Sequence, residues 1–138
     1  MIQDFVIDNS VVMSWCFRDE TSKYTDAVLG QLEHATAYAP AIWPLEVSNV
    51  LLIAERRKRL SQSDSSRFIS LLLELPIIVE PKSPERMLST ILALAREYKL
   101  SSYDASYLDL AMSKGLPIAT TDKNIITAAK RSSVPILK

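Results

Sequence analysis

The chain has 138 residues, of which 48% are hydrophobic and 23% are charged, a composition typical of a globular protein rather than of a disordered chain or a fibre. Its 16 basic and 16 acidic residues cancel, so the net charge gives no sign of a polyanionic partner. The apolar runs are too short to span a membrane, and no basic segment precedes the first of them, as it would in a secretory signal. We therefore expect one domain over residues 1–138, located in the cytoplasm.

Residue counts exclude several kinds of functional site. With one cysteine, Cys16, and one histidine, His34, the chain cannot form an internal disulfide or a Cys/His zinc site. The two glycines, Gly30 and Gly115, are too few and too far apart for the glycine-rich loops that bind nucleotide phosphates. His34 would be the only base for a catalytic triad, and nothing around it marks such a role, so we expect a solvent-exposed helix residue there.

Strand and helix patterns alternate along the chain. We expect strands where short apolar runs end at polar residues or proline, and helices where apolar residues recur at helical spacing after Ser, Thr or Pro. The expected strands cover residues 5–7, 36–39, 77–79 and 117–120, with an edge strand near 134–137. The expected helices start near Ser10, Thr21 or Ser22, Pro44, Ser61 or Ser63, Ser83, and Ser101 or Ser102, and a last one carries Ile125, Ile126 and Ala129.

This alternation predicts an α/β fold, a three-layer α/β/α sandwich with a central, mainly parallel sheet. The runs at 5–7 and 77–79 are expected to be strands buried on both faces. In such a sheet the carboxyl ends of the strands and the amino ends of the following helices share one edge, where ligands collect. Asp8 and Asp122 follow expected strands directly, and two further acids lie in the first turns of expected helices. The four carboxylates expected at one edge are Asp8, Glu46, Asp104 and Asp122.

Each of these acids also has a structural explanation by itself. An Asp after a strand commonly starts a turn or caps a helix. An acid in the first turn of a helix stabilises it by about 0.3 to 1 kcal/mol through the helix dipole. Four carboxylates together would repel each other and raise their pKa values, which would cost stability unless a cation were bound. Carboxylates without histidine or thiolate select a hard ion, Mg²⁺ or Mn²⁺, and such a site suits attack of water on a phosphodiester.

Four short segments around these acids follow one another over nearly the whole chain. They comprise Asp8, Asn9, Ser10 and Val11 with Trp15 and Phe17; Pro44, Glu46, Val47 and Asn49; Leu100, Ser101, Tyr103, Asp104, Ala105, Tyr107 and Leu108; and Thr120 with Asp122. In this order they resemble the four motifs of PIN-domain ribonucleases, specifically the VapC toxins of bacterial and archaeal toxin–antitoxin pairs.

The resemblance implies a metal-dependent endoribonuclease toxin that hydrolyses RNA phosphodiester bonds, forms a homodimer and is neutralised by a cognate VapB-type antitoxin. It implies that the four acids are the catalytic residues and hold Mg²⁺ or Mn²⁺. It also implies that three polar residues support them, namely Ser10, Asn49 and Thr120.

Some residues depart from the family's pattern or lie beside it. Asn9 stands where the family usually has a small residue, and Asp109 lies in a usually apolar stretch. Asp109 follows Asp104 by five positions, which points it away from the Asp104 face of a helix, so we expect a surface acid or one that supports the site indirectly. Lys123, next to Asp122, is a candidate for a phosphate contact. The basic run 56–59 could contact RNA or could be a solvated helix end.

Two other readings of the same acids remain open. A haloacid-dehalogenase-like phosphatase would have a second Asp two residues after the first, where this chain has Ser10. A non-catalytic PIN-like or receiver-like binding module would keep the acids for regulation or stability. A receiver would place an acidic pair at the end of the first strand, where this chain has Asn9 beside Asp8, and a central Asp after the third strand, where it has residues 80–83.

Overall fold

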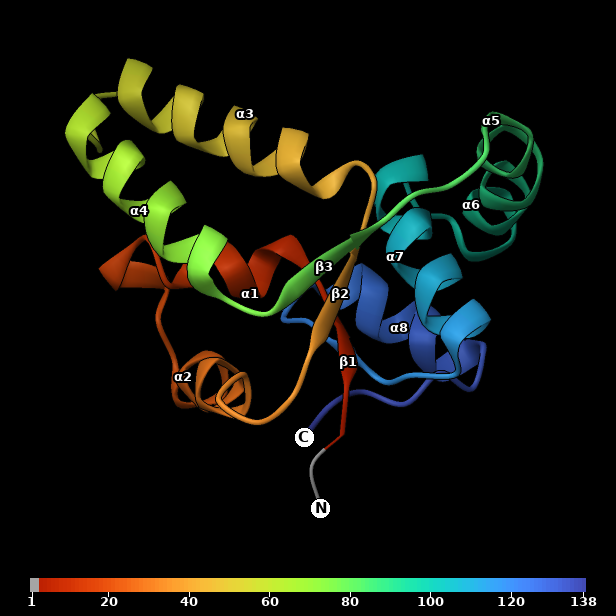
Figure 1. Ribbon diagram of the computed structural model, residues 1–138. Helices are drawn as coiled ribbons and strands as arrows, with labels where there is room; N and C mark the ends of the chain where they lie inside the picture. The colour runs from red at the N-terminus through yellow and green to blue at the C-terminus, as the bar shows by residue number, and fades with distance from the viewer. Residues whose placement is uncertain (1–2) are drawn as a thin grey trace.

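A computed structural model of the protein describes residues 3–138, and its centre is a parallel sheet (Figure 1). The strands lie in the spatial order β3-β2-β1-β4, and each pairing between them is parallel. The predicted α/β fold with a parallel sheet is therefore confirmed. The strands are β1 (Phe5–Ile7), β2 (Ala37–Pro40), β3 (Ile77–Glu80) and β4 (Ile118–Ala119).

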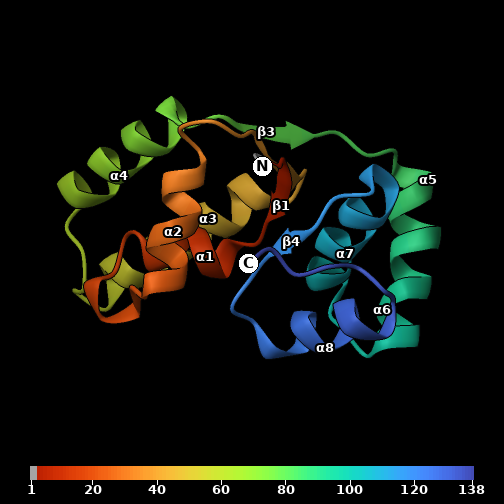
Figure 2. The same cartoon turned by 90° about the horizontal axis from the view of Figure 1, so that it is seen from below.

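The helices form two groups on opposite sides of the sheet, as two views at right angles show (Figure 1; Figure 2). No helix within residues 3–138 is long and apolar enough to cross a membrane. One group comprises α1 (Asn9–Ser14), α2 (Lys23–Gln31), α3 (Trp43–Arg56) and α4 (Gln62–Glu74). The other comprises α5 (Pro84–Arg86), α6 (Leu92–Tyr98), α7 (Ser102–Lys114) and α8 (Lys123–Arg131), with a π-helical segment (Met87–Ile91) between α5 and α6.

Serine side chains start four of the helices by accepting a hydrogen bond from a backbone N–H in the first turn. They decide between the alternatives that the sequence left open, because the capping residues are Ser22, Ser61, Ser83 and Ser101. At the other end, Gly115 closes α7 in the left-handed conformation, with φ of 64°, as expected of a helix that stops at glycine.

The start of α1 differs from the prediction. The position before the helix is Asp8, and Ser10 already lies inside α1. The Ser10 hydroxyl donates to the Asp8 carboxylate at 2.6 Å instead of capping the helix. The prediction of a Ser10 cap was therefore wrong, because the helix already starts at Asn9 and the Ser10 oxygen accepts the backbone N–H of Thr121 instead of one in α1.

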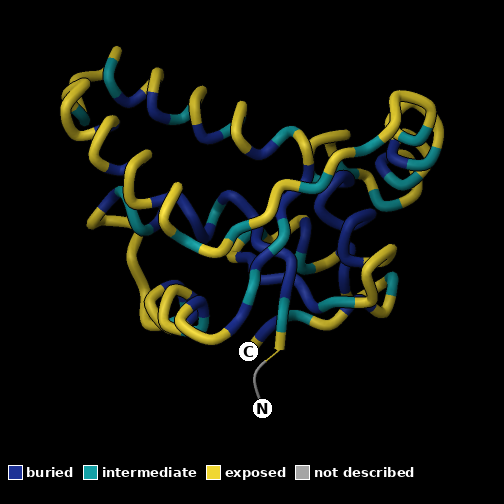
Figure 3. Tube along the Cα trace, viewed as in Figure 1, coloured by how far each residue is buried: buried dark blue, intermediate teal, exposed yellow. Residues whose placement is uncertain are grey.

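The core surrounds β1 and α7, which are the most deeply buried elements (Figure 3). All three residues of β1 are inaccessible to solvent, as predicted for a strand covered on both faces. α7 is buried along residues 105–111, because it packs against β1 and β2 as well as α6 and α8. A helix covered on several sides carries apolar residues around most of its surface, which is why its pattern is less one-sided than that of a surface helix.

Two predicted patterns were wrong about burial. β3 was expected to be buried on both faces, yet it lies at the edge of the sheet, and Ile78 is 47% exposed. The apolar spacing of Ile69, Leu72 and Leu73 predicted one buried face of α4, but only Leu72 of these is buried, with Phe68 and Ser65, and the other two are exposed. The expected edge strand near 134–137 is reduced to a single bridge between residues 118 and 136.

Asp109 is the largest departure from the sequence prediction in the fold. It was expected at the surface or as an indirect support of the site, but it is only 1% exposed. Its carboxylate receives Lys82 at 3.1 Å and Arg86 at 2.7 Å, both from the segment that joins β3 to α6. This ion-pair cluster fixes that segment against the middle of α7.

The Asp109 cluster gives a prediction about stability. Asp109→Ala leaves Lys82, itself largely covered, without its counter-charge, and should lower the free energy of unfolding by about 3 kcal/mol in urea titrations followed by circular dichroism. Arg67→Ala is the control, because it breaks an exposed pair with Asp64 and should cost at most about 1 kcal/mol. An Asp109→Ala protein as stable as the wild type would contradict this role.

Candidate active site

The four predicted acids lie at the edge of the sheet where its strands end. Asp8 directly follows β1 at the centre of the sheet, and Asp122 precedes α8 after the neighbouring strand β4. Glu46 and Asp104 lie in the first turns of α3 and α7. The parallel topology thus places all four at the same edge, as predicted from the strand order of this fold class.

Electrostatic effects show that the four carboxylates lie near one another. The pKa of Asp104 is raised to about 6, first by burial and then by the negative charges of the other three acids. Burial also raises the pKa of Asp8, and the charge of Asp122 adds to it. Like charges in a partly desolvated site disfavour ionisation, so this edge carries more negative charge than it can stabilise by itself.

Asp8 is the most deeply placed of the acids, at 4% exposed. Its Oδ2 atom accepts hydrogen bonds from Ser10 at 2.6 Å and from Thr120 at 2.9 Å. Each of these hydroxyls in turn accepts a backbone N–H, Ser10 from Thr121 and Thr120 from Asp122. Asp8 therefore joins the start of α1 to the loop after β4, and that loop carries the second acid of the site.

Two further carboxylates are also held through one oxygen atom. Asp122 caps α8, with its Oδ1 accepting the backbone N–H groups of Asn124 at 2.9 Å and Ile125 at 3.0 Å. Glu46 accepts a hydrogen bond at Oε1 from the hydroxyl of Tyr107, a wholly buried residue of α7. Burial raises the pKa of Glu46, as it does that of Tyr107.

These contacts leave one oxygen of each fixed carboxylate for other partners. Among residues 3–138 no hydrogen bond is made to Oδ1 of Asp8, Oε2 of Glu46 or Oδ2 of Asp122. Carboxylates fixed at one oxygen and open at the other can each give one ligand to a hard cation. The donor set therefore fits Mg²⁺ or Mn²⁺, although in the described part of the chain no three acidic, histidine or cysteine side chains are already arranged around one ion position.

Within residues 3–138, two of the four other residues predicted for the site form hydrogen bonds with an acid and two do not. Ser10 and Thr120 contact Asp8, as expected of supporting residues. Asn49 is exposed, one turn after Glu46 on α3, and none of the hydrogen bonds found for residues 3–138 joins it to an acid. Lys123 is exposed at the first position of α8, beside Asp122.

Tyr107 is a site residue that the sequence analysis quoted but gave no role. Its contact with Glu46 joins residues 61 positions apart, so no local pattern reveals it. A weaker signal was available, because Tyr107 follows Asp104 by three positions and residues at this spacing share one helix face. The helix that presents Asp104 thus also fixes Glu46.

The basic run at the end of α3 is partly committed to the fold. Arg59 pairs with Asp19 at 2.9 Å and lies over the Phe17 ring, 4.3 Å from its centre. Phe17 is buried, as expected for a core residue. Arg59 lies beyond the end of α3, so these contacts within the fold are neither of the two explanations expected for this run.

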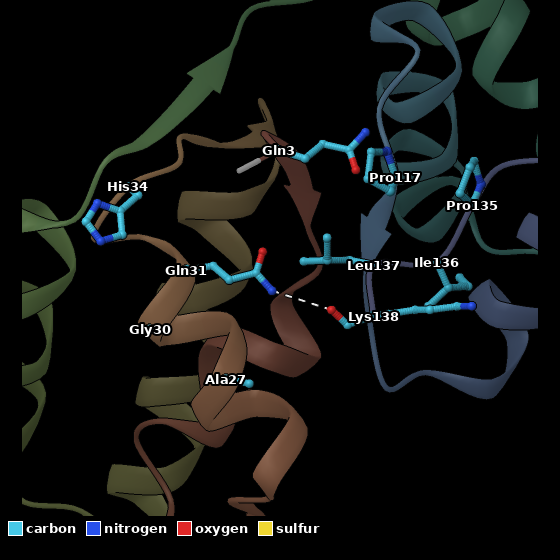
Figure 4. Close-up of a pocket in the computed structure, with 10 residues that line it drawn as sticks. All are labelled: Gln3, Ala27, Gly30, Gln31, His34, Pro117, Pro135, Ile136, Leu137 and Lys138. Atoms are coloured by element: carbon cyan, nitrogen blue, oxygen red, sulfur yellow. Dashed lines mark hydrogen bonds between the residues drawn. The ribbon is translucent and has the colours of Figure 1, made fainter. Parts of the chain in front are cut away.

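A cavity of about 590 Å³ lies at the opposite end of the sheet from the acids (Figure 4). It is lined by Gln3 before β1 and Pro117 before β4, together with Gln31, His34 and the last residues of the chain. Gln31 donates to the Lys138 carbonyl oxygen at 3.5 Å. Among residues 3–138 no acidic side chain lines this cavity, and we place the candidate site at the acidic edge.

Comparison with known proteins gives a family match and several structures of the same fold. Residues 5–131 match the PIN domain family. A comparison with curated proteins found no match. PAE2754 from Pyrobaculum aerophilum is 24% identical, with a TM-score of 0.68 over 93% of this chain and 87% of that chain.

Two other solved structures have a similar fold at lower identity. FitAcB from Neisseria gonorrhoeae is 19% identical, with a TM-score of 0.63 over 97% of this chain and 96% of that chain. A toxin–antitoxin complex from Klebsiella pneumoniae contains a chain that is 18% identical, with a TM-score of 0.61 over 86% of both chains. At these identities the likeness concerns the fold.

The raised pKa of Asp104 predicts how stability depends on pH. Between the ordinary value of 3.8 and about 6 the folded protein binds more protons at Asp104 than the unfolded chain does, so the free energy of unfolding should fall as pH rises through this window. Asp104→Asn should flatten that dependence in metal-free urea titrations. Mn²⁺ should raise the melting temperature more at pH 7 than at pH 5, because protons compete for the same oxygens.

The control for this measurement is Asp26→Asn, which changes an exposed acid on α2 and should keep the wild-type pH dependence. If the difference between wild type and Asp104→Asn stayed constant from pH 4 to 7, Asp104 would not carry the repulsion described here.

Proposed function

This chain belongs to the PIN domain family, and we propose on that basis that it is a metal-dependent endoribonuclease in which Asp8, Glu46, Asp104 and Asp122 are the catalytic, metal-holding residues. The observation that carries the proposal is the acidic edge itself, where three carboxylates are each fixed at one oxygen and open at the other. Such an arrangement costs stability without a cation and suits a cation-assisted hydrolase.

The chemistry proposed is hydrolysis of an RNA phosphodiester bond. A bound Mg²⁺ or Mn²⁺ would supply positive charge at the scissile phosphate and lower the pKa of a water molecule. Asp8, Glu46 and Asp122 would hold the ion through their open oxygens, together with Asp104. Asp104, which lies in the first turn of α7 near the other three acids, would also orient the attacking water and accept its proton. Ser10 and Thr120 keep Asp8 in place, and their removal should act through that carboxylate.

We also propose the toxin role that the sequence resemblance implies, within one PIN domain over residues 1–138 in the cytoplasm. One structure of the same fold is a toxin–antitoxin complex, which supports a protein partner for this chain. A second cavity, of about 360 Å³, lies beside Ser10 and is lined by Met13, Phe17, Val50 and Ile53. This mainly apolar surface next to the acids suits the docking of a VapB-type antitoxin.

A homodimer is part of the same proposal. β3 is an edge strand with Ile78 and Val79 exposed. Apolar side chains on an unpaired strand edge favour contact with another chain. Lys123 and Asn49 stay in the proposal as a phosphate contact and a support of Glu46, respectively, because both lie beside an acid of the site.

The nuclease proposal predicts the effect of removing single charges. Asp8→Asn, Glu46→Gln, Asp104→Asn and Asp122→Asn should each lower the rate of RNA cleavage by about 100-fold or more, since each removes a ligand or the base. Ser10→Ala and Thr120→Ala should lower it about 10- to 100-fold, as is common for residues that orient metal ligands. The measurement is cleavage of total RNA by purified protein with and without Mg²⁺, with mapping of the new ends. Asp26→Asn is the matched control and should cleave like the wild type.

Full activity in Asp8→Asn or Asp104→Asn protein would contradict the nuclease proposal. Cleavage that is unchanged by chelation of divalent ions would also contradict it. Retained circular dichroism spectra and melting temperatures of the variants show that a loss of activity does not come from unfolding.

The proposed antitoxin predicts a mode of inhibition. A cluster of carboxylates attracts a guanidinium or ammonium group, so an antitoxin segment anchored on the apolar surface should deliver an Arg or Lys to the acidic edge. Anchoring makes this delivery effectively intramolecular, so one ion pair can block the site. Replacing that cation with Ala should restore cleavage while the complex largely survives in size-exclusion chromatography. Inhibition that persists after every site-proximal cation is replaced would indicate steric occlusion instead.

A further inference from the structure

A third cavity, of about 550 Å³, shares Asn9 and Val50 with the proposed antitoxin surface and lies beside one of the acids. It draws its walls from α1, α3 and the start of α7, and Glu46 belongs to both the cavity and the acidic site. Its size falls within the range of small-molecule pockets. Its other main lining residues are Asn9, Leu45, Asn49, Leu52 and Tyr103.

The polar wall of this cavity contains an amide without a partner. Asn9 is 9% exposed, and its Oδ1 atom is buried without a hydrogen bond among the described residues. A buried amide that lacks a partner costs about 1 to 3 kcal/mol. Because Asn9 lines the cavity and directly follows Asp8, its amide is a hydrogen-bonding group of the cavity next to the acidic site.

The cavity also has aromatic and aliphatic lining residues. Tyr103 is 59% exposed although it is a large aromatic residue, and it directly precedes Asp104 in the first turn of α7. Leu45 and Leu52 are also exposed on α3. A planar ring with polar edges suits this lining, because it can stack on Tyr103 and form hydrogen bonds with the amides of Asn9 and Asn49. Nucleobases have this character, and each base stacked on an aromatic residue contributes about 1 to 3 kcal/mol.

We propose that this cavity binds the base of the nucleotide next to the scissile phosphate. The inference rests on the proposed ribonuclease function, because it requires a phosphate at the acidic edge. Glu46 connects the two sites, because it is one of the four acids and also lines the cavity. A nucleotide whose phosphate is bound at the acids would therefore place its base near this cavity. Glu46 is the one charged residue among those that line the cavity, so the cavity suits an uncharged ring and not a second phosphate.

The cavity therefore sets which base is preferred at the cut. Tyr103 supplies stacking, which accepts every base, whereas amides distinguish bases by their donor and acceptor patterns, as Asn does with adenine. Tyr103 should thus control the affinity for RNA, and Asn9 the choice of base. The two residues have separable effects, which allows each to be tested independently of the carboxylates.

The first measurement is cleavage of a single-stranded RNA pool with randomised sequence, with mapping of the new ends. Tyr103→Ala should raise the KM about tenfold with a smaller change in kcat, as expected from a lost stacking contact. Tyr103→Trp should restore the wild-type KM, because it keeps an aromatic face. Asn9→Ser should change the base frequencies next to the cut. Leu73→Ala, which removes an exposed side chain from α4, is the control and should leave KM and base preference unchanged.

The second measurement separates this inference from the nuclease proposal. Titration of the full chain with the four nucleoside 5′-monophosphates and with ribose 5-phosphate, followed by NMR in the presence of Mg²⁺, reports base binding without cleavage. Wild type should bind at least one nucleotide about tenfold more tightly than ribose 5-phosphate, and Tyr103→Ala should lose this difference. The Mn²⁺-dependent rise in melting temperature should be the same in Tyr103→Ala as in wild type, which shows that Asp104 is undisturbed.

The outcomes are distinct. Base-dependent nucleotide binding that is lost in Tyr103→Ala supports the cavity even if RNA is not cleaved, in which case the nuclease proposal alone fails. RNA cleavage with KM and base frequencies unchanged in both Tyr103→Ala and Asn9→Ser overturns the cavity proposal and leaves the nuclease proposal standing. Binding of an antitoxin peptide in this cavity, without any base-dependent nucleotide binding, also overturns it.

Discussion

The burial of the Asp8 carboxylate is the constraint on which the site depends. A charge at the end of the central strand is largely removed from water, so it needs compensation by hydrogen bonds or by a cation. The hydroxyls of Ser10 and Thr120 supply part of this compensation, and both are bound in turn by backbone N–H groups of the loop after β4. The position of Asp122 follows from this network, since its own backbone N–H is one of the donors. Two acids of the site are therefore placed by one buried charge.

The other two acids depend on α7. Because this helix is covered by the sheet, α6 and α8, its orientation is fixed along nearly its whole length. Its first turn presents Asp104, and one turn later Tyr107 holds Glu46, so a single helix positions one acid directly and another through a hydrogen bond. Farther along, Asp109 binds the segment after β3. The ion-pair cluster and the acids are thus two ends of the same rigid element.

The sequence was sufficient where local chemistry decides the structure. Neighbouring residues determine the four serine caps other than Ser10, the end of α7 at Gly115, and the positions of the acids that follow strands. These predictions were confirmed in position. It was insufficient where distant parts of the chain decide. An apolar run such as β3 looks buried until the strand order places it at the edge. Helical spacing predicts that Asp109 points away from Asp104, but it cannot reveal that Lys82 and Arg86 of the segment after β3 pair with it.

The half-fixed carboxylates explain how one site can be both ordered and receptive. If both oxygens of each acid were bonded to protein groups, the pKa values would fall and the edge would be stable without a ligand. If neither were bonded, a cation would have to pay the full entropy of ordering the side chains. Asp8, Glu46 and Asp122 each have one fixed oxygen, so their charges still repel one another but their side chains are less free to rotate apart. In the proposed function a bound cation would relieve that repulsion, and because Glu46 also lines the cavity of about 550 Å³, the same cation would fix one side chain of the proposed base site.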